Sequence, residues 1–380
     1  MPRPLRGRAI ALVVALAATL GACASGSTPS PASGPMPDAR STATPVAGPT
    51  PLATAAWPVR TREHLDLWLH TYALLVPDST LVPYFDRGYR ARLLELRRQR
   101  NVTTLVEANR ARLLERIAVN PALATTGQFL PLYFESWSQM RQMIDLTLRA
   151  NGNPRAASDP AAQTAIAVIA AAFPTAPDRE WLRTFAATAD DESRLFYHAY
   201  WTAEAASHAR VAQHTDSLWQ RQWRPALQRF FNNTQQQNGE LYLALPLGGE
   251  GRTVQFGKQQ NAIAGPMPSS RDATDIVLYV VAHEAAGTLA GAAIQDNTSP
   301  AERRAGATSR YEQSAAVRAG ALLLERVLPA TVPGYMRYYL QQAGRAAPPD
   351  PRAAFASTFA IPDVIRDALA RQLDVVLGGI

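Results

Sequence analysis

The most informative segment of the C-terminal part of the chain is Val280-Val-Ala-His283-Glu284-Ala-Ala-Gly287-Thr-Leu289. It has a hydrophobic lead-in, one His-Glu pair, small residues after the pair and a hydrophobic end. Helical spacing from Ile276 onward predicts a helix, and Ser269 and Asp272 are spaced as in a capping box at its start. The stretch therefore places an imidazole next to a carboxylate on one helix.

Two strand-like segments precede this helix. They are Glu240-Leu-Tyr-Leu-Ala-Leu-Pro-Leu247 and Arg252-Thr-Val-Gln-Phe256, and glycines between them indicate a turn. We expect the two segments to pair as a hairpin at the edge of a small sheet. Residues 259–270, with Gly265, Pro266 and Pro268, are expected to form a loop.

The helix resembles the active-site helix of zincin metallopeptidases, whose core is His-Glu-x-x-His. In that family both histidines bind zinc, and the glutamate is the general base toward the zinc-bound water. The resemblance covers roughly residues 240–330 and implies a zincin-like α+β region with Glu284 as the base and His283 as a ligand. It also implies a peptide-like substrate.

This sequence departs from the family pattern at Gly287, which stands where the second histidine would be. Gluzincins take a third ligand from a glutamate on a following helix, and Glu302, Glu312 and Glu325 are candidates. Glu302 fits a capping box after Ser299, so Glu312 matches best. His283 and Glu312 make an incomplete zinc site, since catalytic zinc generally has three protein ligands. We expect no cofactor, with zinc as the alternative.

Two other interpretations of the pair stay open. In one, His283 and Glu284 are an ordinary, partly buried pair in a core helix, and Gly287 and Gly291 allow close helix packing. In the other, a distant histidine completes a zinc site. The candidates are His198, His208 and His214, which fall on different faces of a helical stretch, and His64 and His70.

The part of the chain from Trp57 to Phe231 has helical periodicity. Separate helices are expected around 134–150, 158–173, 178–188, 190–213 and 215–231, with Asp190-Asp191-Glu192 at a helix N-terminus. Residues 86–116 contain nine arginines and four acids. This segment is expected to be a solvated helix face, with a polyanion or lipid-headgroup surface as the alternative.

The N-terminus indicates export. Arg3, Arg6 and Arg8 precede the apolar run Ala9 to Leu20, which is too short to span a membrane and typical of a signal peptide. Removing it lowers the formal charge from +7 to +4, so the basic balance does not indicate a nucleic-acid partner. The run ends in Leu20-Gly21-Ala22-Cys23, which resembles a bacterial lipobox. An ordinary cleavage site within Ala22-Cys23-Ala24 is the alternative.

Cys23 is the only cysteine and Lys258 the only lysine. Thiol catalysis, disulfides and Cys-ligated zinc are therefore excluded in the body. Residues 24–56 hold seven prolines and two charges, which predicts a flexible tether.

The predicted organisation is a lipoprotein signal peptide (1–22), a disordered Pro/Ser/Thr/Gly/Ala-rich tether (23–56), a helical region (57–235) and a degenerate zincin-like region (236–380). The fold class is mainly α with a small β-hairpin or edge sheet. We expect a lipid-anchored cell-envelope protein, with the outer membrane favoured by Ala24, that is inactive or weakly active as a peptidase. The alternative is a non-catalytic envelope scaffold or binding lipoprotein that holds a peptide or protein partner.

Replacing Cys23 by Ser is expected to release the protein from the membrane fraction, because several acyl chains contribute about 0.8 kcal/mol per buried CH₂ to anchoring. Fractionation of cells that express each form, followed by immunoblotting, measures this. Unchanged membrane association of the Cys23→Ser form would contradict lipidation at this residue.

Overall fold

The computed structural model describes residues 56–76, 80–255 and 261–378. Residues from Ala55 to Ile380 belong to one compact unit, which is mainly helical and contains one four-stranded mixed sheet. The predicted helical class is confirmed. The predicted signal peptide, Cys23 and the predicted tether lie outside the described residues.

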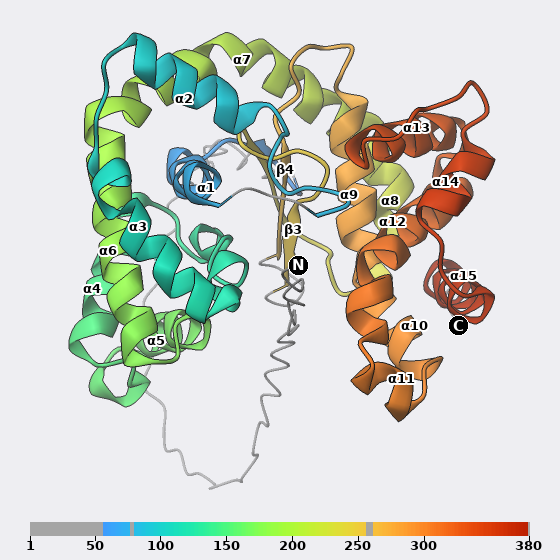
Figure 1. Cartoon of the computed structure of the whole chain (residues 1–380). Helices are drawn as coiled ribbons and strands as arrows, with labels where there is room; N and C mark the ends of the chain where they lie inside the picture. Colours follow the sequence, from blue (N-terminus) through green and yellow to red (C-terminus); the bar gives the residue numbers. More distant parts are fainter. Residues whose placement is uncertain (1–55, 77–79, 256–260, 379–380) are drawn as a thin grey trace, which may run out of the picture. The chain divides into compact units, whose positions relative to one another are not determined.

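Helices account for most of the body (Figure 1). The helices that precede residue 239 in the chain are α1 (Glu63–Leu75), α2 (Tyr89–Gln99), α3 (Leu105–Val119), α4 (Trp137–Arg149), α5 (Pro160–Ala172), α6 (Ala176–Glu192), α7 (His198–Leu218) and α8 (Arg224–Asn233). The helices that follow residue 266 are α9 (Asp275–Gly287), α10 (Ala290–Asp296), α11 (Pro300–Arg304), α12 (Ala307–Val327), α13 (Val332–Gln342), α14 (Arg352–Thr358) and α15 (Asp363–Gly378).

The sheet has the order β1-β2-β4-β3. Its strands are β1 (Val59–Arg60), β2 (Gly239–Ala244), β3 (Arg252–Val254) and β4 (Asn261–Pro266). β2 is parallel to β1 and β4, whereas β3 is antiparallel to β4, with Arg252 opposite Ala264.

The two faces of the sheet bury two separate hydrophobic cores. Side chains alternate along β2, so Leu241 and Leu243 belong to one core while Tyr242 and Ala244 belong to the other. Helices α1–α6 lie on one side of the strands and α8–α15 on the other (Figure 1). Each core contains residues from both sides of the boundary expected after residue 235, including Trp57 in the core of the C-terminal helices.

The hairpin prediction is wrong in its pairing. β2 and the segment at Arg252 do not pair, because β4 lies between them. β4 occupies Asn261–Pro266, inside the residues expected to be a loop. Every residue of β4 is buried, and a short strand buried on both faces lacks the alternation that identifies a strand in sequence.

The predicted helix boundaries between residues 178 and 231 are also wrong. α6, α7 and α8 follow one another through two π-helical turns, Ser193–Tyr197 and Trp219–Trp223. Asp190, Asp191 and Glu192 therefore end α6 and do not begin a helix. Glu192 is buried and accepts a hydrogen bond from His70 at 3.0 Å, so a tertiary contact explains its charge better than a helix dipole.

α9 begins at Asp275, after the expected capping box at Ser269 and Asp272. Its N-cap, Thr274, makes no side-chain capping bond. Together α9 and α10 form the one described segment, Asp275–Asp296, that is apolar and long enough to cross a membrane. Most of this segment is buried in the body, as expected of a core helix.

Buried Asp66 connects three parts of the body. α1 is buried on almost all sides, and from it Asp66 accepts hydrogen bonds from Trp201 Nε1 on α7 at 2.7 Å and from the Leu245 N–H at 3.1 Å. Burial raises the pKa of Asp66 to about 8.

Replacing Asp66 by Asn turns one acceptor oxygen into an amide NH₂, so that a donor faces one of these two N–H donors. The change is expected to lower the free energy of unfolding by about 1–3 kcal/mol. Folding raises the pKa of Asp66 from 3.8 to about 8. The protonated carboxyl therefore contributes its full stabilisation of the folded protein below pH 3.8, and this contribution is lost as the pH rises through about 8. Urea unfolding is therefore expected to show a larger wild-type advantage at about pH 5 than at about pH 9. Half-exposed Asp145→Asn is the control, and an equal difference at both pH values would contradict the prediction.

Candidate functional site

His283 and Glu284 lie on α9 where this helix packs against β3 and β4. His283 is 4% exposed, and its Nδ1 donates to Glu284 Oε1 at 3.1 Å. The same carboxylate oxygen accepts the N–H of Gly251 at 3.0 Å. The two residues of the motif therefore contact each other, and the carboxylate also holds the edge of the sheet.

Gly251 allows the backbone before β3 to lie close against β4. A Cβ atom at Gly251 would collide with the carbonyl oxygen of Ala264 on β4. The residues on either side of Gly251 are an acid, Glu250, and a base, Arg252, at the β3 edge of the sheet. Glu250 is buried and accepts from Gln313 Nε2 at 2.5 Å, while the guanidinium carbon of Arg252 lies 5.4 Å from the ring centre of Phe129.

The electrostatics of the His283–Glu284 pair favour the charged forms. Burial raises the pKa of Glu284, but His283, Arg252 and the Gly251 N–H outweigh it and the pKa is lowered. Burial lowers the pKa of His283, but Glu284 and Glu250 outweigh it and that pKa is raised. Both shifts therefore favour the imidazolium–carboxylate form of the pair.

Residues 80–88, which lead into α2, reach across to this centre (Figure 1). The Gly248 N–H donates to the carbonyl of Tyr84 at 2.6 Å, and the Glu250 N–H donates to that of Pro83 at 3.1 Å. The amide of Gln313 on α12 bonds both the N–H and the carbonyl of Val82. Sequence reasoning missed these residues, because they come from segments far apart in the chain and form no motif.

Gly287, at the position that the second histidine has in His-Glu-x-x-His, lies against Ala316 of α12. A Cβ atom at Gly287 would be 3.1 Å from the Cβ of Ala316, and one at Gly320 would be 3.0 Å from the Cα of His283. The two helices therefore run antiparallel at very short distance. A larger side chain at either glycine would have to push them apart.

The structure does not bring Glu312 to His283. Gly287 lies against Ala316 and His283 lies against Gly320, whereas Glu312 lies one turn before Ala316 on α12. Two helical turns, about 11 Å along the axes, therefore separate Glu312 from the level of His283. No hydrogen bond joins them within the described residues. Glu312 is half-buried, and burial raises its pKa while Arg252 lowers it.

The other candidate ligands have separate partners. Glu302 caps α11 through Ser299, as predicted, and His198 contacts Glu63 at 2.8 Å. His64 contacts the Phe134 carbonyl at 3.0 Å. His208 lies beside Glu204 on the same helix. Within the described ranges, no group of three or more His, Cys, Asp or Glu residues could hold a metal ion.

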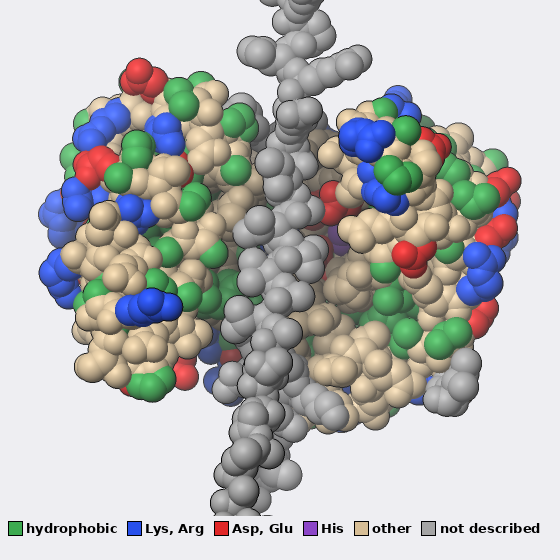
Figure 2. All heavy atoms as spheres, turned by 90° about the horizontal axis from the view of Figure 1, so that it is seen from below, with side chains coloured by type: hydrophobic (Ala, Val, Ile, Leu, Met, Phe, Trp, Pro, Cys, Tyr) green, Lys and Arg blue, Asp and Glu red, His purple; other side chains and the backbone are tan. Residues whose placement is uncertain are grey.

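Most arginines of residues 86–116 contact acidic side chains or backbone carbonyls of the protein itself. Five of the nine arginines form ion pairs, and two donate to backbone carbonyls; the seven are Arg92, Arg97, Arg98, Arg112 and Arg116, then Arg87 and Arg110. Acidic and basic side chains both occur on the face seen in Figure 2. These contacts support a solvated helix face more than a polyanion surface.

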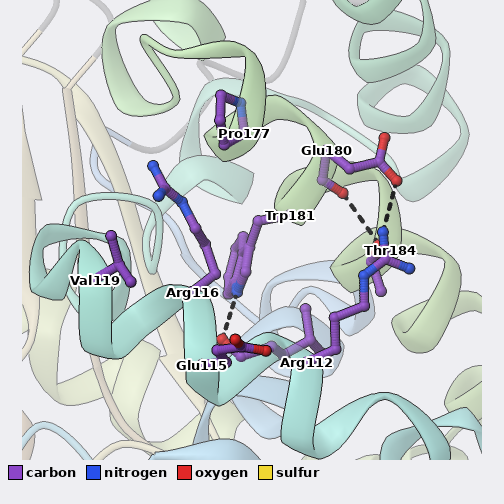
Figure 3. A pocket seen from close by; sticks show the side chains of 9 residues that line it. Arg112, Glu115, Arg116, Val119, Pro177, Glu180, Trp181 and Thr184 are labelled. Atoms are coloured by element: carbon purple, nitrogen blue, oxygen red, sulfur yellow. Dashed lines mark hydrogen bonds and ion pairs between the residues drawn. The ribbon is translucent and has the colours of Figure 1, made fainter.

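A shallow pocket of about 270 Å³ lies between α3 and α6 (Figure 3). Arg112 pairs with Glu180 at its rim at 2.9 Å, and the indole of Trp181 donates to the Leu113 carbonyl at 3.0 Å. Arg116, which also lines the pocket, pairs with Asp178 outside it at 2.6 Å.

No family model matches the chain, and no curated protein or solved structure matches it either.

Replacing Gly320 by Ala is expected to lower the free energy of unfolding by about 1–3 kcal/mol, because the added methyl would meet Tyr335 Oη and the α9 backbone. Gly291→Ala on α10 is the matched control, since its Cβ would meet nothing within 4 Å. That change is expected to be neutral or to stabilise by about 0.5–1 kcal/mol. Chemical denaturation measures both, and equal effects would contradict close packing of α9 on α12.

Proposed function

We propose that this chain is a lipid-anchored envelope protein with a zincin-like centre that holds a partner and does not carry out zinc-dependent hydrolysis. The observation that carries the proposal is the contact between Gly287 and Ala316. The helix keeps the His-Glu pair of the resemblance, but backbone and methyl groups fill the position of the second ligand.

The bonds of Glu284 also argue against general-base chemistry. A general base must lie within hydrogen-bond reach of the water that it activates. Oε1 of Glu284 instead accepts from both His283 and Gly251, and its side chain is only 12% exposed. Its hydrogen bonds join α9 to the sheet.

The free edge of β3 supports a binding role. Within the described residues, no backbone hydrogen bond reaches the outer side of Arg252–Val254, since β3 pairs only with β4. An exposed strand edge can accept an extended peptide as an additional strand. A peptide or protein segment is therefore the proposed partner.

The envelope location rests on the N-terminal sequence. Three arginines, an apolar run and Leu20-Gly21-Ala22-Cys23 have the order of a lipoprotein signal peptide. Lipid on Cys23 would anchor the body to the membrane, and the following proline-rich residues would hold it at a distance.

Metal analysis tests the non-hydrolytic part of the proposal. After incubation with zinc and removal of the excess, purified wild-type protein is expected to keep far less than about one zinc per chain, because His283 alone cannot hold the metal. His283→Ala is the control and should match the wild type. About one zinc per chain that is lost in His283→Ala would overturn the proposal.

A further inference from the structure

A second buried pair of a histidine and a glutamate lies among the helices α1–α6, on the other side of the sheet from α9 (Figure 1). The side chains of His70 on α1 and Glu192 at the end of α6 are both fully buried, and His70 Nε2 lies 3.0 Å from Glu192 Oε1. His70 Nδ1 lies 3.0 Å from the hydroxyl of Tyr89 on α2. The imidazole therefore connects three helices through its two nitrogens.

The other carboxylate oxygen of Glu192 is held from α2 and from the start of α3. The hydroxyl of Thr104, the N-cap of α3, donates to Glu192 Oε2 at 2.6 Å, and the guanidinium of Arg97 lies 3.3 Å from the same oxygen. Arg97 also pairs with Glu107, a half-exposed residue of α3, at 2.9 Å. One network of polar side chains thus connects α1, α2, α3 and α6.

The partners of His70 favour one form of its ring. Burial raises the pKa of Glu192, but its hydrogen bonds and Arg97 outweigh burial and the pKa is lowered. Arg97 already supplies a buried cation to this carboxylate, so an imidazolium at His70 would place a second one against it. A neutral ring with its proton on Nε2 donates to Glu192 and accepts from the Tyr89 hydroxyl. This form satisfies both partners of the ring.

The remaining groups around the ring do not favour an imidazolium. The ring of Tyr197, from the π-helical turn after α6, stacks on His70 with the ring centres 4.2 Å apart. Asp66 lies one turn earlier on α1, and burial raises its pKa to about 8. For His70 itself, burial and Arg97 lower the pKa and outweigh Glu192, which raises it.

We propose that His70 is an acid-sensitive latch, a side chain whose neutral form holds α1 against α2 and α6 and whose protonation favours their separation. Through Glu192 and Thr104 the same network also holds the start of α3. Acid favours any opening of these helices that exposes the imidazole to water, because the exposed ring can bind a proton. The inference goes beyond the proposed function and does not depend on it, since the centre on α9 contributes no residue to the latch.

The direction of the pH effect follows from the lowered pKa of His70. A base whose pKa is lowered by folding contributes its full stabilisation above its ordinary pKa of 6.5, and this contribution is lost as the pH falls through the folded pKa. Between about pH 7.5 and about pH 5.5 the opening equilibrium constant is expected to rise by up to about tenfold, the gain from one proton bound only in the open form. Asp66 acts in the opposite direction over this range, so the effect of His70 is measured as a difference between variants.

Amide hydrogen exchange of the purified protein measures this opening. Exchange in α1, α2 and α3, corrected for the intrinsic effect of pH, is compared between wild type and His70→Gln at about pH 7.5 and about pH 5.5. Glutamine keeps a donor toward Glu192 but does not titrate. The opening constant of the wild type is therefore expected to rise roughly three- to tenfold more on acidification than that of His70→Gln. His208→Gln on α7 is the matched control and should respond to pH as the wild type does.

An equal pH response of wild type and His70→Gln would overturn the inference, and so would a loss of the response in His208→Gln. A second measurement needs no variant to fold. Nitrogen NMR of the wild type, labelled at histidine, is expected to show the His70 ring, identified by its contact with Tyr197, as neutral at about pH 5.5 with its proton on Nε2. An imidazolium at about pH 7, or a neutral ring with its proton on Nδ1, would overturn the latch.

Discussion

The hydrogen bond from the Gly251 N–H to the Glu284 carboxylate joins the sheet edge to α9, and the centre is arranged around it. Only glycine allows that backbone to lie so close to β4. The flanking residues, Glu250 and Arg252, are thereby placed at the same edge with opposite charges. A carboxylate used in this way fastens two elements together, and the same bonds that stabilise it reduce its availability as a base.

The second constraint is the short distance between α9 and α12. Glycines on both helices let each backbone approach the other. Ala316 lies against the space that a side chain at residue 287 would need, and the α9 backbone lies against Gly320. At the position where the resemblance would place a second histidine, α9 instead packs against α12. His283 and Glu284 contact each other, and the Gly251 N–H donates to the same carboxylate oxygen.

Much of the fold could be predicted from local pattern, and the failures have physical causes. The helical class and the capping box at Ser299–Glu302 follow from periodicity and local hydrogen bonding. β4 was missed because burial on both faces removes the alternation by which a strand is recognised. The π-helical turns after α6 and α7 leave no break in composition, so neither they nor the position of Glu192 could be located.

Residue types and spacing alone show that the chain after Cys23 contains no cysteine, that His283 and Glu284 fall in one helical pattern, and that a glycine follows Glu284 by three residues. These are properties of residue type and spacing. Only the tertiary structure decided what surrounds the pair. Tyr84, Glu250, Arg252 and Gln313 come from segments up to about 230 residues apart, and no local pattern relates them. The partners of a buried pair depend on distances in space, so they could be assigned only once β3, α9 and α12 were placed together.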